Sequence, residues 1–316
     1  MTAIKPSLAV NTAGLDLALP IMAAAGCGGF GQDLARLGVL SHLGALVTPS
    51  ISARSHATAH RVRLQEAPSS LVLPTDWPSV GTNSLKADAL PWDVEGAVPV
   101  VASLVGTTSN EFGSAAAGLR RQTALRHIMG VEVNLGCPDA TNRGIPFSHA
   151  DFAATKVVSR VREELPRDIP VIAKLSADVS DLVAIARGCV KSGAAGIVVT
   201  GPLRALAMSG TRLSLPAEST GLAGPALLPV TLRAVYDLTR AIREGRLPSV
   251  AVIAVGGIST GQQVAQAMAV GASAVQVGTA LIHDPGSLAT LAQDLSAVLT
   301  AHDLTDVRDL VGLAHT

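Results

Sequence analysis

One cysteine at the end of an apolar run is the residue best placed for chemistry. Cys137 lies in the segment Val133-Asn134-Leu135-Gly136-Cys137-Pro138-Asp139, after the polar Asn134 and before Pro138, which interrupts helices. A thiol at a strand end can take up or release a proton when its pKa and its exposure are tuned. Free cysteines are also among the most frequently buried residues, so packing is the alternative role. The position favours acid/base chemistry.

Two glycine turns late in the chain predict a site for a phosphate group. One lies in Ala254-Val255-Gly256-Gly257-Ile258 and the other in Gln276-Val277-Gly278-Thr279-Ala280. Glycine lets backbone N–H groups approach a phosphate at the end of a strand, whereas the alternative is that both segments only make tight turns. A phosphate site and an acid/base thiol together indicate a flavin-dependent redox enzyme in which Cys137 moves the proton that accompanies a hydride.

A lysine supports the same interpretation. Lys174 ends the apolar run Val171-Ile172-Ala173, where a barrel strand would expose it at the active face. A fixed cation there stabilises the negative charge that develops near N1 and O2 of a reduced flavin. The alternative is a strand-end lysine that extends its ammonium to solvent, and the glycine turns favour the flavin role.

The other cysteines and the histidines are weaker candidates. Cys27 shares a strand-end position, whereas Cys189 falls within a helical pattern and is expected in the core. No histidine stands beside a second ligand at metal spacing, so we predict no metal site. His56, His60 and Arg54 could contact a substrate, but the favoured interpretation is that they are solvated.

These residues require parallel strands that end on one face. Short runs rich in Val, Ile, Ala and Leu recur along the chain, and helix-period segments follow most of them, as in parallel strands with right-handed crossovers. The eight predicted strands are residues 19–25, 45–49, 98–105, 130–135, 170–175, 196–200, 250–255 and 274–277. The predicted helices are residues 32–40, 110–127, 151–165, 178–192, 225–244 and 260–270, with Asp151 and Asp178 as N-caps. This alternation predicts an α/β fold with a (β/α)8 TIM barrel, whose chemistry lies at the C-terminal strand ends.

One stretch departs from the alternation. Residues 52–92 have few helical patterns and contain Pro68, Pro74, Pro78, Gly81 and Pro91. Long irregular loops in compact domains are usually lids or binding loops. We therefore expect a single barrel domain over residues 1–316, with residues 52–92 as a lid excursion after the second strand that covers the active site.

Composition excludes several partners. Lys+Arg and Asp+Glu are both 24 and the pI is near 7.1, so no basic field points to nucleic acid. The mean hydropathy is +0.41, yet no uninterrupted apolar 18-mer is present, so we expect no membrane partner. The odd count of three cysteines favours a reducing compartment, and we predict a cytoplasmic protein that binds a small molecule.

Nearly the whole chain resembles the dihydroorotate dehydrogenase family. The resemblance rests on the order and spacing of several segments. They are Pro20-Ile21-Met22-Ala23-Ala24-Ala25-Gly26, Asn134-Leu135-Gly136-Cys137-Pro138, Ala173-Lys174-Leu175-Ser176, Gly221-Leu222-Ala223-Gly224-Pro225-Ala226 and the two glycine turns.

The resemblance implies FMN as the cofactor. It places Ala24, Ala25 and Gly26 under the flavin, Lys174 at the N1 side, and Thr48 and Asn134 among the cofactor contacts. It also implies that the phosphate is surrounded by Gly221, Gly257, Gly278 and Thr279.

The resemblance also assigns the chemistry. Cys137 matches the cysteine base of the cytosolic branch, whereas membrane-linked relatives carry serine and an N-terminal membrane-binding extension. The base removes a proton from one carbon while a hydride leaves the neighbouring carbon for flavin N5. In the reverse direction, Cys137 protonates the carbon beside an activated C=C bond that receives the hydride.

The substrate side departs from the family pattern. Pro49 stands after Val47-Thr48 where relatives carry a lysine, and Asp139 replaces the asparagine that follows Cys-Pro. An ionised carboxylate only accepts hydrogen bonds, whereas an amide also donates. Thr200-Gly201-Pro202 stands where an asparagine-threonine pair is usual, and of the paired lid asparagines only Asn83 or Ser84 is a candidate remnant.

These losses change the predicted substrate. A polar ligand that loses its partners binds several kcal/mol more weakly, so we expect a small cyclic amide or enone-like substrate other than dihydroorotate, bound by Asn134 and Asp139. Genuine dihydroorotate dehydrogenase is the first alternative, with a lid arginine in place of the lysine. The candidates for that role are Arg54, Arg61 and Arg63.

Two further alternatives and the assembly remain open. A tRNA-dihydrouridine synthase shares an Asn-x-Gly-Cys-Pro segment but normally carries basic residues after it, and a barrel that only binds FMN is the non-enzymatic alternative. Dimers are common in the resembled family, which allows a homodimer. The sequence does not identify an electron acceptor, and an iron–sulfur route would need a partner subunit.

Overall fold

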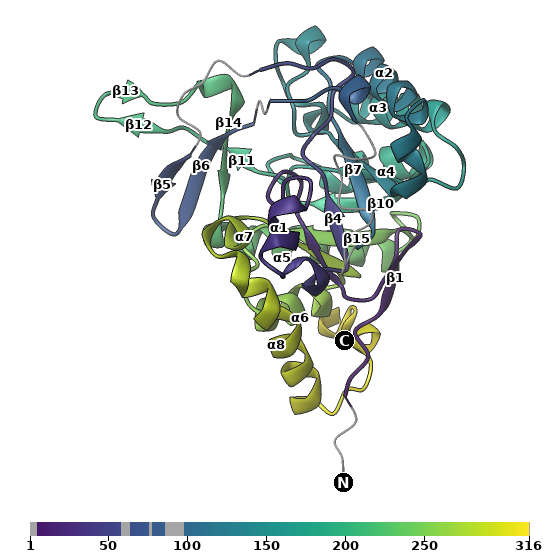
Figure 1. Ribbon diagram of the computed structural model, residues 1–316, viewed down its shortest axis with the longest axis vertical. Helices are drawn as coiled ribbons and strands as arrows, with labels where there is room; N and C mark the ends of the chain where they lie inside the picture. Colours follow the sequence, from purple (N-terminus) through teal and green to yellow (C-terminus); the bar gives the residue numbers. More distant parts are fainter. Residues whose placement is uncertain (1–4, 58–63, 76–77, 86–97, 316) are drawn as a thin grey trace.

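Eight parallel strands form a closed barrel in the order in which they occur along the chain (Figure 1). The computed structural model describes residues 5–57, 64–75, 78–85 and 98–315. The barrel strands are β3 (Ile21–Ala23), β4 (Ala45–Val47), β7 (Val100–Leu104), β8 (Ile128–Asn134), β9 (Val171–Lys174), β10 (Ala194–Val199), β15 (Ala251–Val255) and β16 (Ala274–Val277). Strand β16 pairs with β3 and closes the ring. The predicted TIM barrel and all eight predicted strands are confirmed.

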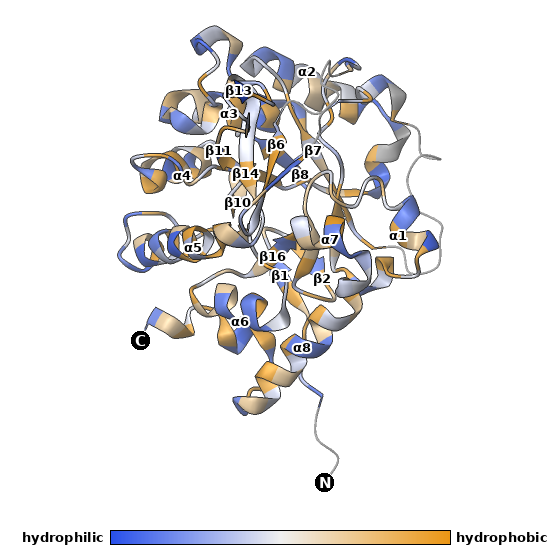
Figure 2. Cartoon of the chain, turned by 90° about the vertical axis from the view of Figure 1, so that its left-hand side faces the viewer, coloured by the Kyte–Doolittle hydropathy of each residue, from blue (hydrophilic) through white to orange (hydrophobic). Residues whose placement is uncertain are grey.

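The barrel strands are apolar because both of their faces are covered. Every residue of β3, β4, β7, β9 and β16 is buried, as expected where side chains fill the barrel on one face and contact helices on the other. Figure 2 shows this as hydrophobic colour along the central strands, while the outer helices carry hydrophilic residues as well. The apolar runs in the sequence therefore form the buried barrel strands, whose packing fixes the positions of the strand ends.

The outer helices include all six that the sequence predicts. They are α1 (Gln32–Arg36), α2 (Ser109–Arg120), α3 (Asp151–Glu164), α4 (Leu182–Lys191), α5 (Leu228–Arg243), α6 (Gly261–Ala269), α7 (Thr279–His283) and α8 (Leu288–Ala301). The predicted helix over 110–127 ends earlier, and a 3-10 helix follows it at Thr123–His127. The helices α7 and α8 were not predicted.

Both predicted N-caps are wrong. Ala150 is the N-cap of α3, and Asp151 is its first helical residue. Asp181 caps α4, accepting a hydrogen bond from Ala184 N at 2.9 Å. Asp178 lies before that helix, and its carboxylate instead binds side chains from other segments.

A small antiparallel sheet stands beside the barrel mouth. Its order is β11 (Leu203–Arg204), β14 (Thr220–Ala223), β6 (Ser70–Pro74) and β5 (Gln65–Ala67). A second hairpin, β12 (Met208–Ser209) with β13 (Arg212–Leu213), extends next to it (Figure 1). Strands β5 and β6 belong to the predicted lid excursion, which is therefore partly regular strand; its covering role stays a prediction.

The far end of the barrel carries a short hairpin of β1 (Val10–Thr12) and β2 (Leu15–Leu17). One large cluster of buried residues joins this hairpin, the barrel and the helices, while the side sheet has a separate cluster of Val72, Ala207 and Leu215. Among the described residues, no helix combines the length and the apolarity that a membrane span needs.

Candidate active site

Three polar side chains meet inside the barrel. Lys174 Nζ donates to Glu132 Oε1 at 3.2 Å and to Gln276 Oε1 at 3.0 Å, and Gln276 Nε2 donates to Glu132 Oε2 at 2.6 Å. Their exposed fractions are 8%, 0% and 1% for Lys174, Glu132 and Gln276. Strand β16 is not a neighbour of β8 or β9 in the ring, so the contact crosses the barrel interior.

This ion pair fixes the ammonium of Lys174. A buried charge is tolerated only when it is paired and hydrogen-bonded, and here a carboxylate and an amide supply the partners. Glu132 and Gln276 were not predicted as site residues. The available signal was the position of Glu132 two residues before Asn134, which places both side chains on the same face of β8.

A second set of polar groups lies at the C-terminal ends of β4, β7 and β8. Asn134 Nδ2 donates to Ser50 Oγ at 3.4 Å, and the Ser50 and Ser103 hydroxyls lie 3.1 Å apart. Thr48 Oγ1 accepts from Ser103 N at 3.1 Å and donates to Pro49 O at 3.0 Å. The predicted cofactor residues Thr48 and Asn134 are thus joined through two serines that sequence reasoning missed.

The two glycine turns lie at adjacent strand ends. Gly257 follows β15 with a φ of +77°, and an added Cβ would lie 2.4 Å from Leu228 N. Gly278 follows β16, and an added Cβ would lie 3.3 Å from Cys27 Sγ and 3.5 Å from Ala24 Cβ. Gly257 is required by its positive φ and by the close approach of Leu228, whereas a side chain at Gly278 would only make tight contacts with its neighbours.

The predicted flavin seat is next to the second turn. Ala24 N donates to Val277 O at 2.9 Å, which holds the segment Ala24, Ala25 and Gly26 against the end of β16. Thr279 is the first residue of the short helix α7. The residues expected under the flavin and the phosphate residues of this turn are therefore brought together.

Gly221 is placed elsewhere. It lies on β14 in the side sheet, in register with Leu73 of β6 and Arg204 of β11. Its role toward the phosphate stays a prediction.

These residues fit FMN. A buried ammonium is held in the barrel interior, and glycine backbone, which carries no side chain, follows the ends of β15 and β16 at Gly257 and Gly278. Lys174 would stabilise the isoalloxazine ring, and the glycine turns would bind the phosphate.

Cys137 is buried at the end of β8. Its exposed fraction is 4%, and Sγ lies 3.2 Å from Gly106 O and 3.0 Å from Asn134 O. Burial has the largest effect on the Cys137 thiol and raises its pKa to about 12. At neutral pH the residue is a thiol, which holds a proton ready for donation and accepts one only as the minor thiolate.

The other two cysteines differ from Cys137 in place. Cys27 is half-buried at the flavin seat, and burial raises the pKa of its thiol to about 11, although the charge of Lys174 opposes this. Cys189 is fully buried on α4, as predicted.

Asp139 closes the segment that follows Cys137. Its Oδ1 accepts from Thr141 N at 2.8 Å and from Thr141 Oγ1 at 2.6 Å, which caps a 3-10 helix, η5 (Ala140–Asn142). One carboxylate oxygen is thus used in the fold of the loop. The predicted contact of Asp139 with substrate stays a prediction.

The lid candidates are not gathered at one point. Arg54 and His56 are exposed. The pKa of Glu111 is lowered: burial is the largest single cause and raises it, but hydrogen bonds from Thr107 and Thr108, together with the charge of Arg54, outweigh burial. Asn83 is exposed on a 3-10 helix over Thr82–Ser84. His60, Arg61 and Arg63 lie outside the described residues.

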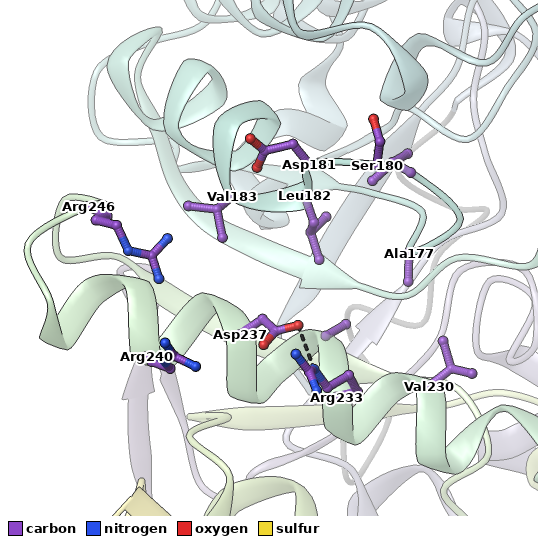
Figure 3. Close-up of a pocket in the computed structure, with 12 residues that line it drawn as sticks. Ala177, Ser180, Asp181, Leu182, Val183, Val230, Arg233, Asp237, Arg240 and Arg246 are labelled. Carbon is purple, nitrogen blue, oxygen red and sulfur yellow. Dashed lines mark hydrogen bonds and ion pairs between the residues drawn. The ribbon is translucent and has the colours of Figure 1, made fainter.

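A groove of about 310 Å³ lies away from all of these residues, between α4 and α5 (Figure 3). It is lined by the β9–α4 loop and by one side of α5, where Arg233 Nε pairs with Asp237 Oδ2 at 2.8 Å. None of the predicted site residues contributes to it. We therefore place the active site at the strand ends and not in this groove.

The chain is similar in sequence to known enzymes. A family model described as dihydroorotate dehydrogenase matches residues 7–299. The catalytic subunit of dihydroorotate dehydrogenase B (NAD(+)) from Geotalea uraniireducens is 35% identical over 310 residues, which cover 98% of this chain and 98% of that protein. The subunit of the same name from Desulforudis audaxviator is 35% identical over 314 residues, 99% of each.

The fold also matches a solved structure. The DHODH of Eimeria tenella, in complex with ferulenol, aligns with a TM-score of 0.80 at 19% identity and covers 100% of this chain and 90% of that chain. This likeness concerns the fold alone and agrees with the closed barrel described above.

Proposed function

Because this chain belongs to the dihydroorotate dehydrogenase family, and is thereby an FMN-dependent oxidoreductase that acts on a CH–CH bond, we propose that it oxidises dihydroorotate with Cys137 as the base. The observation that carries the proposal is that the Cys137 thiol follows the end of β8, while the buried ammonium of Lys174 belongs to the end of the neighbouring strand β9. Membership in this family replaces the alternative of a tRNA-dihydrouridine synthase.

Bound FMN would accept a hydride from one carbon of the substrate. Cys137 takes the proton from the carbon next to it, or returns that proton in the reverse direction. Lys174 holds positive charge where negative charge develops, and Glu132 and Gln276 keep its ammonium in place. The buried strand ends exclude water from these groups, which strengthens each electrostatic interaction.

Dihydroorotate is the first candidate substrate because relatives that span almost the whole chain carry that activity in their names. This support outweighs the prediction of a different substrate made from the sequence.

A second candidate is a small cyclic amide other than dihydroorotate. Pro49 in place of a lysine and Asp139 in place of an asparagine favour it, since both changes remove hydrogen-bond donors. The first candidate requires that another cation take over from the lysine.

The names of the same relatives bear on which subunits this chain assembles with. Those relatives are named catalytic subunits, which supports a second, electron-transferring subunit as partner of this chain. A homodimer and a cytoplasmic location stay predictions from the sequence.

The test is anaerobic mixing of the FMN-loaded protein with dihydroorotate, followed by the flavin absorbance. We expect bleaching in the wild type and its loss in C137A with the bound flavin retained. Bleaching by dihydrouracil but not by dihydroorotate would favour the second candidate. A flavin that no candidate substrate bleaches, although dithionite reduces it, would indicate a barrel that only binds FMN.

A further inference from the structure

A small pocket opens beside the segment that carries Cys137. It lies where the ends of β8, β9 and β10 meet the side sheet, and its volume is about 20 Å³. Its lining residues are Thr75, Gly136, Pro138, Pro146, His149, Ser176, Pro202, Arg204 and Thr220. A space of this size holds one water-sized group and not a ring, so it suits a substituent of a ligand.

One carboxylate organises the polar wall of this pocket. Asp178 Oδ1 accepts from Ser176 Oγ at 2.5 Å and lies 3.0 Å from His149 Nε2. Asp178 Oδ2 accepts from Arg204 N at 3.1 Å and from Arg204 Nε at 3.3 Å. Both oxygens are therefore occupied, and the negative charge of Asp178 is offset by its own donors.

Arg204 keeps part of its guanidinium available. Its Nε is bound to Asp178, but its two terminal nitrogens make no hydrogen bond to any residue in the described parts of the chain, and its side chain is 65% exposed. A guanidinium is planar and binds a carboxylate through two parallel hydrogen bonds. One edge of Arg204 is thus anchored and the other can bind an anion.

We propose that Arg204 binds a carboxylate substituent of the substrate in this pocket, and that Asp178 acts as its positioning residue. The inference rests on the proposed function and names the group that sets specificity. The family lysine is absent at Pro49. Arg204 supplies a cation in its place from β11, a strand of the side sheet.

The cofactor phosphate is the other anion at the barrel mouth. The glycine turns that fit a phosphate follow β15 and β16, whereas the pocket is built by segments after β8, β9 and β10. Neither Gly257 nor Gly278 lines the pocket. The pocket therefore binds a substrate group and not the phosphate.

The test compares ligands that differ only in the carboxylate. Orotate and uracil are titrated into FMN-loaded protein and binding is read from the perturbed flavin absorbance. We expect R204A to weaken orotate binding by about 10- to 100-fold and to leave uracil binding unchanged, since a charge-assisted pair is lost. R204K keeps the charge without the planar guanidinium, so its affinity for orotate should lie between those of the wild type and R204A.

The matched control is R212A, because Arg212 is an exposed arginine on the neighbouring strand β13. It should bind both ligands as the wild type does, and FMN content should be equal in all variants. D178N should weaken orotate binding less than R204A does.

Several results would overturn the inference. A wild type that shows no preference for orotate over uracil contradicts it, even if Cys137 still turns over a neutral substrate. Equal losses in R204A and R212A would indicate long-range attraction and not a site. Loss of FMN in R204A would assign the residue to the phosphate. Dihydroorotate turnover with unchanged orotate affinity in R204A would leave the proposed function intact and remove the inference alone.

Discussion

The barrel interior and the barrel mouth are built in different ways. In the interior, Lys174, Glu132 and Gln276 are buried and bind one another across three strands. At the mouth, Arg204 is mostly exposed and Asp139 belongs to a short loop. We proposed that the interior groups act on the cofactor, whereas the mouth groups act on the substrate.

The difference explains where the sequence departs from its family. A substitution in the buried network leaves an uncompensated charge, so that network resists change. A loop residue at the mouth is replaced without disturbing the core. Pro49 and Asp139 can therefore differ from the family pattern while Lys174 and the glycine turns match it.

The largest effect on turnover is expected for Cys137→Ala, since Cys137 lies at the boundary between the barrel interior and the mouth. Turnover should fall by about 100- to 10,000-fold because the proton transfer loses its base. Stopped-flow bleaching of the flavin measures it. The matched control is C27A, since Cys27 lies beside Gly278 and is the weaker candidate for the same proton transfer. Equal losses in both variants would show that the thiol at 137 has no special part.

Removal of the interior charge should be the next largest effect. Glu132→Gln leaves Lys174 without its ionic partner, so the free energy of unfolding should drop by about 3 to 5 kcal/mol. The exposed pair of Arg233 and Asp237 provides the control, and D237N should change it by less than about 1 kcal/mol. Urea unfolding gives the free energy of unfolding of both variants. A similar loss in E132Q and D237N would mean that the interior network contributes no more to stability than the surface pair does.

The same variant should shift the flavin midpoint potential. In E132Q the ammonium of Lys174 acts unopposed and favours the more negative, reduced cofactor, so the potential should rise, whereas K174M should lower it. Spectroelectrochemical titration gives both values. Shifts of the same sign would contradict an electrostatic role for the pair.

The pH dependence of oxidation sharpens the role of the thiol. Since burial raises the pKa of Cys137 to about 12 from 9.0, the thiolate is a minor form at neutral pH and grows as pH rises. The rate of proton removal should increase by about tenfold per pH unit from about pH 6 to about pH 9, and C137A should lack this slope. A plateau within this range would show that substrate or cofactor lowers the pKa of the thiol.

The smallest effect is expected at the mouth. Asp139→Asn keeps an oxygen that can cap η5, so the free energy of unfolding should change by less than about 0.5 kcal/mol. A changed KM with unchanged stability would support the predicted contact of Asp139 with substrate. An unchanged KM would restrict the residue to its loop.

The fold was predictable because strand and helix patterns are local. Apolar runs identified each barrel strand, and the same pattern correctly placed Lys174 at the end of β9 and Cys137 just after the end of β8. The chemical roles of both residues stay predictions. The predicted cap of α3 was one residue too late, since Ala150 precedes Asp151. The cap of α4 was missed because Asp181 lies nearer to the helix than Asp178, whose carboxylate accepts from Arg204 on another segment. Such contacts leave no local signal.

The interior network and the Arg204 pocket escaped prediction for the same reason. Glu132 and Gln276 are far apart in sequence and meet only when the barrel closes. Arg204 reaches the mouth because β11 pairs with β14, which pairs with β6. Neither pairing follows from the composition of those short strands.

The pairing of β6 with β14 links two excursions that leave the barrel after different strands. Residues 70–74 and 220–223 share one hydrogen-bonded ladder, so neither segment can be exchanged alone without breaking it. Chimeras that transplant substrate preference from a relative must therefore move both excursions as one cassette, together with the arginine strand that borders them.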